Sequence, residues 1–390
     1  MDKVRIGIIG IGNMGTSHAK AIIEGKVPSG VLTAVADINP ARLQFMRETY
    51  GDSVACFASG TKLMDSGLVD AIIIATPHYD HPPLAIEAFQ RKLHVLSEKP
   101  AGVYTKQVRK MNAAADKAGV VFALMFNQRT LAAYRWIKEV IDSGKYGRIR
   151  RSVWHITKWY RSQGYYNSGA WRATWAGEGG GVLLNQCPHN LDLWQWICGM
   201  PAKIQAHCHV GKWHDVEIED DVTAYMEYEN GATGTFITST GDCPGTNRLE
   251  IVLDGATIVC EDYKKVTVYE LEISEPEFAK LSIQANSANF GQPKYKTIIP
   301  DLPGTNFPHS IVMETFASAI LNSTPLVADG REGINSLTLS NAMYLSSWLN
   351  QEIALPLDED MFYKELKKRI ATSKHKEGSS SVESDMSSTF

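Results

Sequence analysis

The stretch that decides the fold is VRIGIIGIGNMG, which spans Val4–Gly15, read together with Asp37. It opens with a run of strand formers that is long enough for a buried parallel strand. The run ends in the pattern G-x-G-x-x-G, formed by Gly10, Gly12 and Gly15, and an amphipathic helix pattern follows at once. Glycines at this spacing allow a tight turn, close approach of a pyrophosphate to bare backbone, and close packing of helix on strand. The stretch therefore predicts a strand, a phosphate-binding turn and a helix.

A second apolar run, Val31–Ala36, ends at Asp37, where dinucleotide-binding folds place an acidic side chain that accepts hydrogen bonds from the adenosine ribose. The charge of Asp37 would repel a 2′-phosphate, and the next residue, Ile38, supplies no compensating charge. Arg42 is the nearest candidate cation, and the helix signal at Pro40 is expected to turn it away from the site. The sequence therefore predicts NAD, rather than NADP, as the cofactor.

Strand and helix patterns continue to alternate along the first third of the chain. Apolar runs at Asp70–Ala75, His94–Ser97 and Val120–Phe126 are separated by helix patterns, which predicts an α/β fold with a doubly wound parallel sheet. Ligands of such sheets bind at the carboxyl ends of the strands. Residues 1–125 are therefore predicted to form an NAD-binding Rossmann domain. The residues expected to line the cofactor are Gly10, Gly12, Asn13, Met14, Gly15, Asp37, Ile38, Thr76, Pro77, His81, Glu98, Lys99 and Asn127.

The pattern changes in residues 126–372, which are predicted to form an α+β domain that binds substrate and mediates oligomerisation. Helix patterns are found at Thr130–Ser143, Val182–Cys198 and 308–350. Strand patterns run from residue 203 to 271, with turn signals at Asn230-Gly231 and Gly255 that indicate hairpins of a large, mostly antiparallel open sheet. Residues 373–390 are low in apolar side chains and are expected to be a disordered tail.

Two strands of this predicted sheet, Val222–Tyr228 and Thr233–Thr238, carry apolar or aromatic side chains on both faces. The alternation places Val222, Ala224 and Met226 on one face, and Tyr225 and Phe236 elsewhere. One face should cover the helices of the domain, which leaves the other in need of a partner. A homodimer or homotetramer is therefore expected.

The composition narrows the class of protein. The chain has 390 residues and a formal net charge of −4, so no basic field favours nucleic acid. No apolar run approaches the roughly 18–20 residues of a membrane span, and the N-terminus is already a strand, so a cytoplasmic protein without a leader is expected. The six cysteines show no C-x-x-C pairing and are expected to be unpaired.

Further motifs carry a resemblance to a known family. Glu98-Lys99-Pro100 follows a predicted strand, and three glycines, Gly179–Gly181, precede Asn185 and His189. Together with the glycine turn, these motifs resemble the glucose–fructose oxidoreductase / inositol dehydrogenase (Gfo/Idh/MocA) family, over nearly all of the chain up to about Leu357. The family pattern has Asp, three residues, then His, and Asn185 stands in the place of that Asp. The resemblance implies NAD(P)-dependent oxidation of a secondary alcohol of a sugar or cyclitol, or the reverse reduction.

The residues agree with that chemistry, since oxidising a carbinol needs a base for the hydroxyl proton and a cation for the developing alkoxide. Lys99, at a strand end, can hydrogen-bond the reacting oxygen. His189 titrates near pH 6.5 when unperturbed and suits the base. The predicted helix places Asn185 and His189 on one face, and Pro188 is expected to kink it. Asn185 cannot take a proton but can orient a hydroxyl or His189.

The segment from residue 158 to 181 is dense in aromatic side chains, arginine and glycine. It contains Tyr160, Arg161, Gln163, Tyr165, Tyr166, Trp171, Arg172 and Trp175. Aromatic faces and guanidinium forks suit a polyhydroxylated substrate, but packing against the same domain or a neighbouring subunit explains them equally well. The residues expected at the substrate are Lys99, Tyr160, Gln163, Trp171, Arg172, Trp175, Asn185 and His189. His207, His209 and His214 lack a strong third-ligand pattern, so no metal is expected.

Three functions remain open from the sequence. The first is a dehydrogenase of a sugar, anhydrosugar, glycoside or cyclitol. The second is a glycosidase that uses NAD for transient oxidation and would cleave without net NADH accumulation. The third is a non-catalytic regulator that senses a dinucleotide, which would be expected to lack Lys99 or His189. The partners predicted for the enzyme are a small carbohydrate or cyclitol, but no nucleic acid and no membrane.

Overall fold

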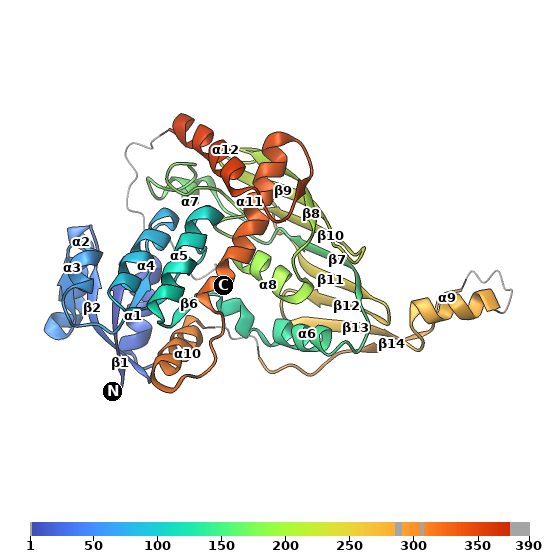
Figure 1. Cartoon of the computed structure of the whole chain (residues 1–390), viewed down its shortest axis with the longest axis horizontal. Coiled ribbons are helices and arrows are strands. Elements are labelled where there is room, and N and C mark those ends of the chain that lie inside the picture. Colours follow the sequence, from blue (N-terminus) through green and yellow to red (C-terminus); the bar gives the residue numbers. More distant parts are fainter. Residues whose placement is uncertain (1, 285–290, 305–307, 375–390) are drawn as a thin grey trace.

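Two β-sheets organise the chain in the computed structural model, which describes residues 2–284, 291–304 and 308–374. The N-terminal sheet and its helices lie at one end of the molecule, and the larger sheet stands beside them (Figure 1). The predicted α/β fold class is confirmed. Most of the expected disordered tail, residues 375–390, lies outside the described residues.

The N-terminal sheet has six parallel strands in the order β3-β2-β1-β4-β5-β6. This is the order of a doubly wound dinucleotide-binding sheet. Its strands are β1 (Val4–Ile9), β2 (Gly30–Ala36), β3 (Ala55–Phe57), β4 (Ala71–Ile74), β5 (His94–Ser97) and β6 (Phe122–Leu124). Strand β3 was not predicted, because it is only three residues long and is partly buried, which is too short for a clear strand pattern.

Helices on both faces cover this sheet. They are α1 (Asn13–Ile23), α2 (Pro40–Tyr50), α3 (Gly60–Met64), α4 (His81–Gln90) and α5 (Thr105–Ala118), with the short turns η1 (Gly51–Ser53) and η2 (His78–Asp80). Helix α2 begins as its sequence indicates: the side chain of Asn39 accepts a hydrogen bond from the backbone N–H of Ala41, and Pro40 occupies the first turn.

One helix from the far end of the chain also packs on this sheet. Helix α10 (His309–Asn322) buries Val312, Met313 and Phe316 in the same apolar cluster as β1 and α1. Its Glu314 accepts hydrogen bonds from the backbone and hydroxyl of Ser29, at 3.0 and 2.6 Å. The C-terminal part of the chain therefore completes the hydrophobic core of the N-terminal sheet.

The second sheet has nine strands in the order β14-β13-β12-β11-β7-β10-β9-β8-β15. Among these strands only the neighbours β7 and β10 are parallel, so the expectation of a mostly antiparallel sheet is confirmed, as are the hairpins at Asn230-Gly231 and Gly255. The strands are β7 (Ile149–Ile156), β8 (Lys203–Val210), β9 (Glu219–Glu227), β10 (Thr233–Ser239), β11 (Asn247–Leu253), β12 (Ala256–Glu261), β13 (Lys265–Leu271), β14 (Tyr295–Ile298) and β15 (Ile353–Ala354).

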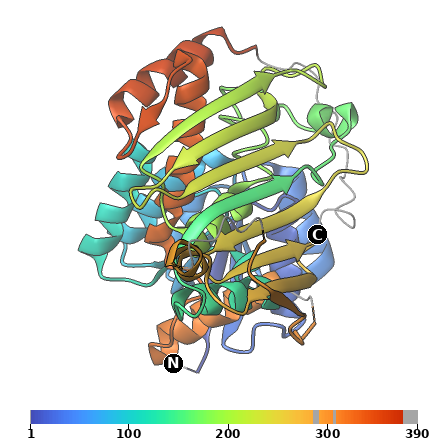
Figure 2. The ribbon, with the colours of Figure 1, turned by 90° about the vertical axis from the view of Figure 1, so that its right-hand side faces the viewer.

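Figure 2 looks onto the open face of this sheet, with helices α11 and α12 behind its upper edge. The covered face buries Val222, Ala224, Met226 and also Phe236, which lies directly opposite Ala224 on the neighbouring strand. Placing Phe236 apart from those residues was therefore wrong, because cross-strand partners share a face. Tyr225 lies on the open face and is 43% exposed.

The remaining helices are α6 (Ala132–Asp142), α7 (Gln163–Asn167), α8 (Pro188–Cys198), α9 (Glu275–Gln284), α11 (Gly333–Leu349) and α12 (Glu359–Thr372), with η3 (Asn127–Thr130) and η4 (Gly330–Glu332). The helix expected at Val182–Cys198 begins only at Pro188, since residues 182–187 form turns. Helix α9 projects beyond the body of the molecule (Figure 1). Within the described ranges, no helix is long and apolar enough to cross a membrane.

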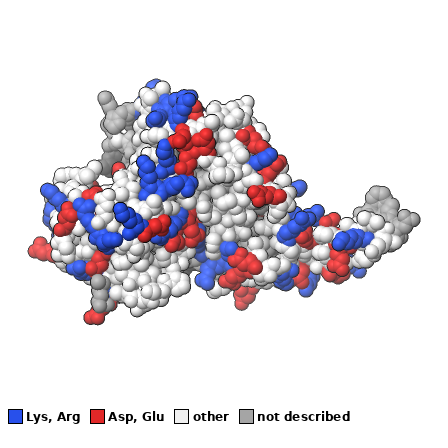
Figure 3. Space-filling model, in the orientation of Figure 1, with Lys and Arg blue, Asp and Glu red and all other residues white. Residues whose placement is uncertain are grey.

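The face shown in Figure 3 carries basic and acidic side chains in alternation rather than a field of one sign. Ion pairs join α5 to α12, where Lys106 meets Asp360 and Arg109 lies 2.7 Å from Glu359. Such exposed pairs contribute little stability. Their interleaved signs give no electrostatic footprint for nucleic acid on this face.

Candidate active site

The glycine turn after β1 has the geometry that a dinucleotide needs. Gly10 has a φ of +93°, and a Cβ added there would lie 2.6 Å from the carbonyl oxygen of Ala75. A Cβ at Gly15 would lie 1.9 Å from the carbonyl oxygen of Gly10, whereas one at Gly12 would meet nothing within 4 Å. Gly10 and Gly15 therefore permit the tight turn, and Gly12 leaves open space at the start of α1, where Asn13 and Met14 follow, for a phosphate to approach the backbone.

Asp37 ends β2 beside this turn. Its Oδ2 accepts a hydrogen bond from the backbone N–H of Ile11 at 2.7 Å, and its Oδ1 accepts one from Asn39 at 2.8 Å. Arg42 points back to the same turn: its Nε donates to the carbonyl oxygen of Ile11, and its Nη2 lies 2.8 Å from Thr16 Oγ1. The expectation that α2 turns Arg42 away was wrong, because Arg42 lies in the first turn of α2, next to the cofactor crevice.

The residues predicted around the end of β4 differ in their surroundings. His81 is buried, and its Nδ1 and Nε2 lie 2.7 and 2.8 Å from the carbonyl oxygens of Pro100 and Thr76. It therefore ties the two strand ends together instead of facing a ligand. The hydroxyl of Thr76 is buried and has no hydrogen-bond partner among the described residues, while Ile38 is 91% exposed. Pro77 precedes η2, and Asn127 is buried in η3.

Glu98 links the end of β5 to helix α1. Its Oε1 lies 2.6 Å from His18 Nε2 of α1, and the ring of His309, the first residue of α10, lies 5.5 Å from that of His18. Burial acts to raise the pKa of Glu98, but the hydrogen bond and charge of His18, together with the charges of His309 and Lys99, outweigh it and hold the pKa at about 2. Neither histidine was predicted at the site, although His18 follows the last glycine of the turn by three residues.

Lys99 reaches from the end of β5 to the second sheet's side of the crevice. Its Nζ donates a hydrogen bond of 2.9 Å to the backbone carbonyl of Asn185. Burial lowers the pKa of Lys99, and the charges of Arg161 and Arg172 lower it further, while the carboxylates of Glu98 and Glu178 oppose them. Lys99 therefore sits among charges of both signs, two arginines and two carboxylates.

His189 is the second residue of α8, which begins at Pro188, a favourable position for proline. The expected kink at Pro188 was therefore wrong, and Asn185 and His189 do not share a helix face, because Asn185 precedes the helix. Burial, together with the charges of Lys99 and His309, holds the pKa of His189 well below its usual value. His189 is neutral at neutral pH, and its Nδ1 is buried without a hydrogen-bond partner in the described part of the chain.

Asn185 is bonded to a carboxylate that the sequence reasoning missed. Its Nδ2 donates to Oε1 of Glu178, and Oε2 of Glu178 accepts a hydrogen bond of 2.6 Å from the backbone N–H of Ala173. Glu178 is 1% exposed. This contact fixes the orientation of the Asn185 amide, so that Oδ1 is the atom turned away from Glu178. The available signal was an acidic residue directly before the three glycines.

A second buried carboxylate holds the glycine segment. Glu219 accepts hydrogen bonds from the backbone N–H groups of Gly181 and Leu183, at 2.8 and 2.9 Å, and from the hydroxyl of Tyr344 at 2.7 Å. A Cβ at Gly181 would lie 1.9 Å from the carbonyl oxygen of Glu219, so only glycine fits there. Burial raises the pKa of Glu219 to about 7. Glu219 thereby positions the turn that carries Asn185.

The aromatic and arginine-rich segment divides into two groups. Tyr165 lies between two guanidinium groups, with Arg161 Cζ 5.2 Å and Arg172 Cζ 4.5 Å from its ring centre. Nη1 of Arg172 also donates to the Tyr165 hydroxyl at 2.7 Å. The ring of Trp171 lies 5.5 Å from that of His78, which η2 provides. These residues face the same side as Lys99, since both arginine charges act on it.

The other predicted substrate residues are engaged in structural contacts or exposed. Gln163 exchanges two hydrogen bonds with the backbone of Asp215, at 2.9 and 3.3 Å. The ring of Trp175 packs edge-on against Tyr344 and Trp348, at 5.6 and 5.5 Å, which fits the packing alternative that the sequence left open. Tyr160 is 51% exposed. His214 pairs with the buried Asp220, and no cluster suited to a metal ion is found among the described residues.

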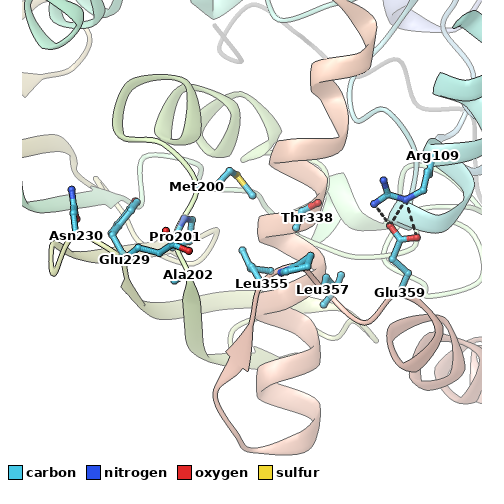
Figure 4. Close-up of a pocket in the computed structure, with 12 residues that line it drawn as sticks. Arg109, Met200, Pro201, Ala202, Glu229, Asn230, Thr338, Leu355, Leu357 and Glu359 are labelled. Atoms are coloured by element: carbon cyan, nitrogen blue, oxygen red, sulfur yellow. Dashed lines mark hydrogen bonds and ion pairs between the residues drawn. The ribbon is translucent and has the colours of Figure 1, made fainter.

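A separate pocket of about 590 Å³ lies beside α11, where Met200–Ala202 meets Leu355–Leu357 (Figure 4). The only charged pair across it, among the described residues that line it, is Arg109 with Glu359, and none of the predicted site residues contributes to it. The candidate active site is therefore the crevice at the carboxyl ends of the parallel strands.

Fold and site together define an oxidoreductase that binds NAD in its N-terminal Rossmann sheet. The model of the oxidoreductase family with an NAD-binding Rossmann fold matches residues 4–126, and the model of the GFO/IDH/MocA C-terminal domain matches residues 134–259. The chain belongs to the Gfo/Idh/MocA family, which confirms the resemblance seen in the sequence.

Among similar proteins, myo-inositol 2-dehydrogenase of Thermotoga maritima is 25% identical over 273 residues, or 68% of this chain and 77% of its own. Glucose-6-phosphate 3-dehydrogenase of Bacillus subtilis is 29% identical over 154 residues, 40% of this chain and 42% of its own. The solved structure of the WlbA dehydrogenase of Bordetella pertussis, in complex with NADH and UDP-GlcNAcA, is 27% identical with a TM-score of 0.75, and the match covers 91% of this chain and 100% of that one.

Proposed function

We propose that this protein is an NAD-dependent dehydrogenase that transfers hydride between the nicotinamide and a secondary alcohol of a sugar, anhydrosugar, glycoside or cyclitol. The observation that carries the proposal is the convergence of a cation and a neutral base from different parts of the chain. Lys99, from the parallel sheet, bonds the backbone of Asn185 at 2.9 Å. His189 begins the next helix and lies close enough to feel the charge of Lys99.

The roles follow from the chemistry of each side chain. NAD⁺, when bound, supplies the hydride acceptor. His189, neutral at neutral pH, takes the proton of the substrate hydroxyl, and the ammonium of Lys99 stabilises the negative charge that develops on the oxygen. Since Nδ2 of Asn185 is committed to Glu178, its Oδ1 is the atom that accepts a hydrogen bond from a neighbouring substrate hydroxyl.

The relatives support the substrate class, since their names include inositol dehydrogenases and a sugar phosphate dehydrogenase. The presence of both Lys99 and His189 favours an enzyme over a dinucleotide-sensing regulator. The proposal includes a cytoplasmic location. It also includes a homodimer or homotetramer formed through the open face of the nine-stranded sheet.

The test is a screen for NAD⁺ reduction across inositols, free and anhydro sugars, and glycosides, with Lys99→Ala and His189→Ala as inactive controls. Arg135→Gln is the matched control, because Arg135 is exposed on α6 and is not among the residues described around the crevice. Cleavage of a glycoside without net NADH formation would identify the glycosidase alternative. An enzyme that binds NADH but turns over no member of the panel would refute the proposal.

A further inference from the structure

We infer that the substrate carries an anionic group, a carboxylate or a phosphate ester, which Arg161 and Arg172 bind beside the reacting alcohol. This inference rests on the proposed dehydrogenase function and narrows its substrate class. It starts from the two guanidinium groups that flank Tyr165 on the side of Lys99.

The first observation is that neither guanidinium has an acidic partner. In the described part of the chain, no ion pair joins Arg161 or Arg172 to a carboxylate. Most of the other described arginines do form an ion pair with an aspartate or a glutamate. Nη1 of Arg161 donates to the backbone carbonyl of Tyr160 at 2.9 Å, and Nη1 of Arg172 donates to the hydroxyl of Tyr165. Their Nε and Nη2 groups donate to no described residue.

The second observation is how firmly the two side chains are held. Both are partly buried, and each stacks on two aromatic rings: Arg161 on Trp159 and Tyr165, and Arg172 on Tyr165 and Trp171. Stacking of this kind restrains a planar guanidinium while leaving its edge free to donate in parallel to two oxygens. The two forks are therefore preorganised for carboxylate or phosphate oxygens.

The third observation is the local charge. The charges of Arg161 and Arg172 both act on Lys99, so three cations share one crevice. The carboxylates of Glu98 and Glu178 also act on Lys99 while His18, Asn185 and Ala173 hold them in place, so the cations outnumber the carboxylates among these five groups. Holding like charges together in a partly buried site is costly unless a counter-charge joins them. An anionic substrate supplies that charge, whereas a neutral polyol does not.

The test compares matched neutral and anionic substrates: glucose with glucuronate and glucose 6-phosphate, and inositol with an inositol phosphate. We expect kcat/KM of the wild type to be at least tenfold higher for the anionic member of a pair. Whichever of glucuronate and glucose 6-phosphate is preferred distinguishes a carboxylate from a phosphate. Arg161→Gln and Arg172→Gln should each lower kcat/KM for the anionic member about 10- to 100-fold, as loss of hydrogen bonds to a charged group predicts. The neutral member should change less than about threefold, and Arg135→Gln should change neither.

A binding assay keeps the inference separate from the proposed function. Glucuronate and glucose 6-phosphate are titrated into the NADH complex, whose own NADH affinity shows that each variant is folded. Saturable binding that both arginine variants weaken supports the inference even if no substrate is oxidised. Equal binding of neutral and anionic sugars, or equal loss of both in the variants, would overturn it while leaving a dehydrogenase of neutral polyols intact.

Discussion

Replacing Asn185 with aspartate should create a pH-dependent instability, because it sets a second carboxylate against Glu178. In the wild type the Asn185 amide donates to the buried Glu178. In Asn185→Asp that donor is lost, and two carboxylates face each other. The pair can either remain doubly ionised and repel or bind one proton between them.

Coulomb's law and the ordinary pKa of aspartate give the approximate size of each cost. Two charges about 4 Å apart repel by about 4 kcal/mol at an effective dielectric constant of about 20. Keeping the new carboxyl protonated costs about 1.5 kcal/mol at pH 5 and about 5.6 kcal/mol at pH 8, from an ordinary aspartate pKa of about 3.9. The state of lower free energy is populated, which is the protonated pair at pH 5 and the doubly ionised pair at pH 8. The free energy of unfolding of the variant should therefore fall by about 1.5 kcal/mol at pH 5 and by about 4 kcal/mol at pH 8. The sign follows from a folded-state pKa raised above the unfolded one, which makes the variant less stable as pH rises.

The assay is the shift in the unfolding midpoint relative to wild type at pH 5 and pH 8. The matched control is Asn185→Asp combined with Glu178→Gln. In that double variant the introduced amide at position 178 can donate to the introduced carboxylate at position 185 and still accept from the backbone N–H of Ala173, so most of the stability lost at pH 8 should return. An equal shift at both pH values, or a double variant no more stable than the single one, would refute the contact and the role assigned to it.

Four further outcomes are expected. The kcat/KM for NAD⁺ should exceed that for NADP⁺, and Asp37→Ser should narrow the ratio; a wild-type preference for NADP⁺ would contradict this. Lys99→Ala and His189→Ala should each lower kcat by about 10²- to 10⁴-fold with NADH binding kept, and more than about a third of wild-type kcat would show that the residue is not catalytic. Sedimentation should show a dimer or tetramer that Tyr225→Lys shifts toward the 43.1 kDa monomer. Because burial raises the pKa of Glu219 from 4.5 to about 7, its contribution to stability should fall as pH rises through that window, a slope that Glu219→Gln removes.

The parallel sheet was predictable because its signals are local. Every strand except β3 is a short apolar run followed by a helix pattern or a polar motif, and the glycine turn fixes the entrance of the first helix. Strand β7 was not predicted, because Arg150 and Arg151 interrupt the alternation of apolar and polar residues near its start. Its place at the centre of the second sheet depends on β10 and β11, which lie far along the chain. Local pattern does not encode such pairings.

The site likewise contains residues that local motifs identify and residues that only tertiary contacts bring together. Lys99 and His189 stand in short motifs, so the sequence alone is enough to propose them as site residues. Glu178 gains its role only through a turn that brings it to Asn185, and His309 arrives from a helix more than a hundred residues further along the chain. The helix predicted around Asn185 was wrong, because α8 begins only at Pro188. The hydrogen bond from the backbone N–H of Gly181 to Glu219 holds the preceding segment in turns, and this tertiary contact overrides the apolar periodicity.

The return of α10 to the first sheet has a practical meaning for anyone who exchanges halves between relatives. In a chimera cut near residue 125, the apolar cluster of β1 and α1 would lose its native contacts with Val312, Met313 and Phe316. The hydrogen bonds between Ser29 and Glu314 would then have to form between residues from two different proteins. A transplant of the nucleotide-handling half should therefore carry residues 308–327 with it as a second, discontinuous piece. The N-terminal sheet and α10 are distant in the sequence but form one packed unit, so a chimera with a single crossover point would separate them.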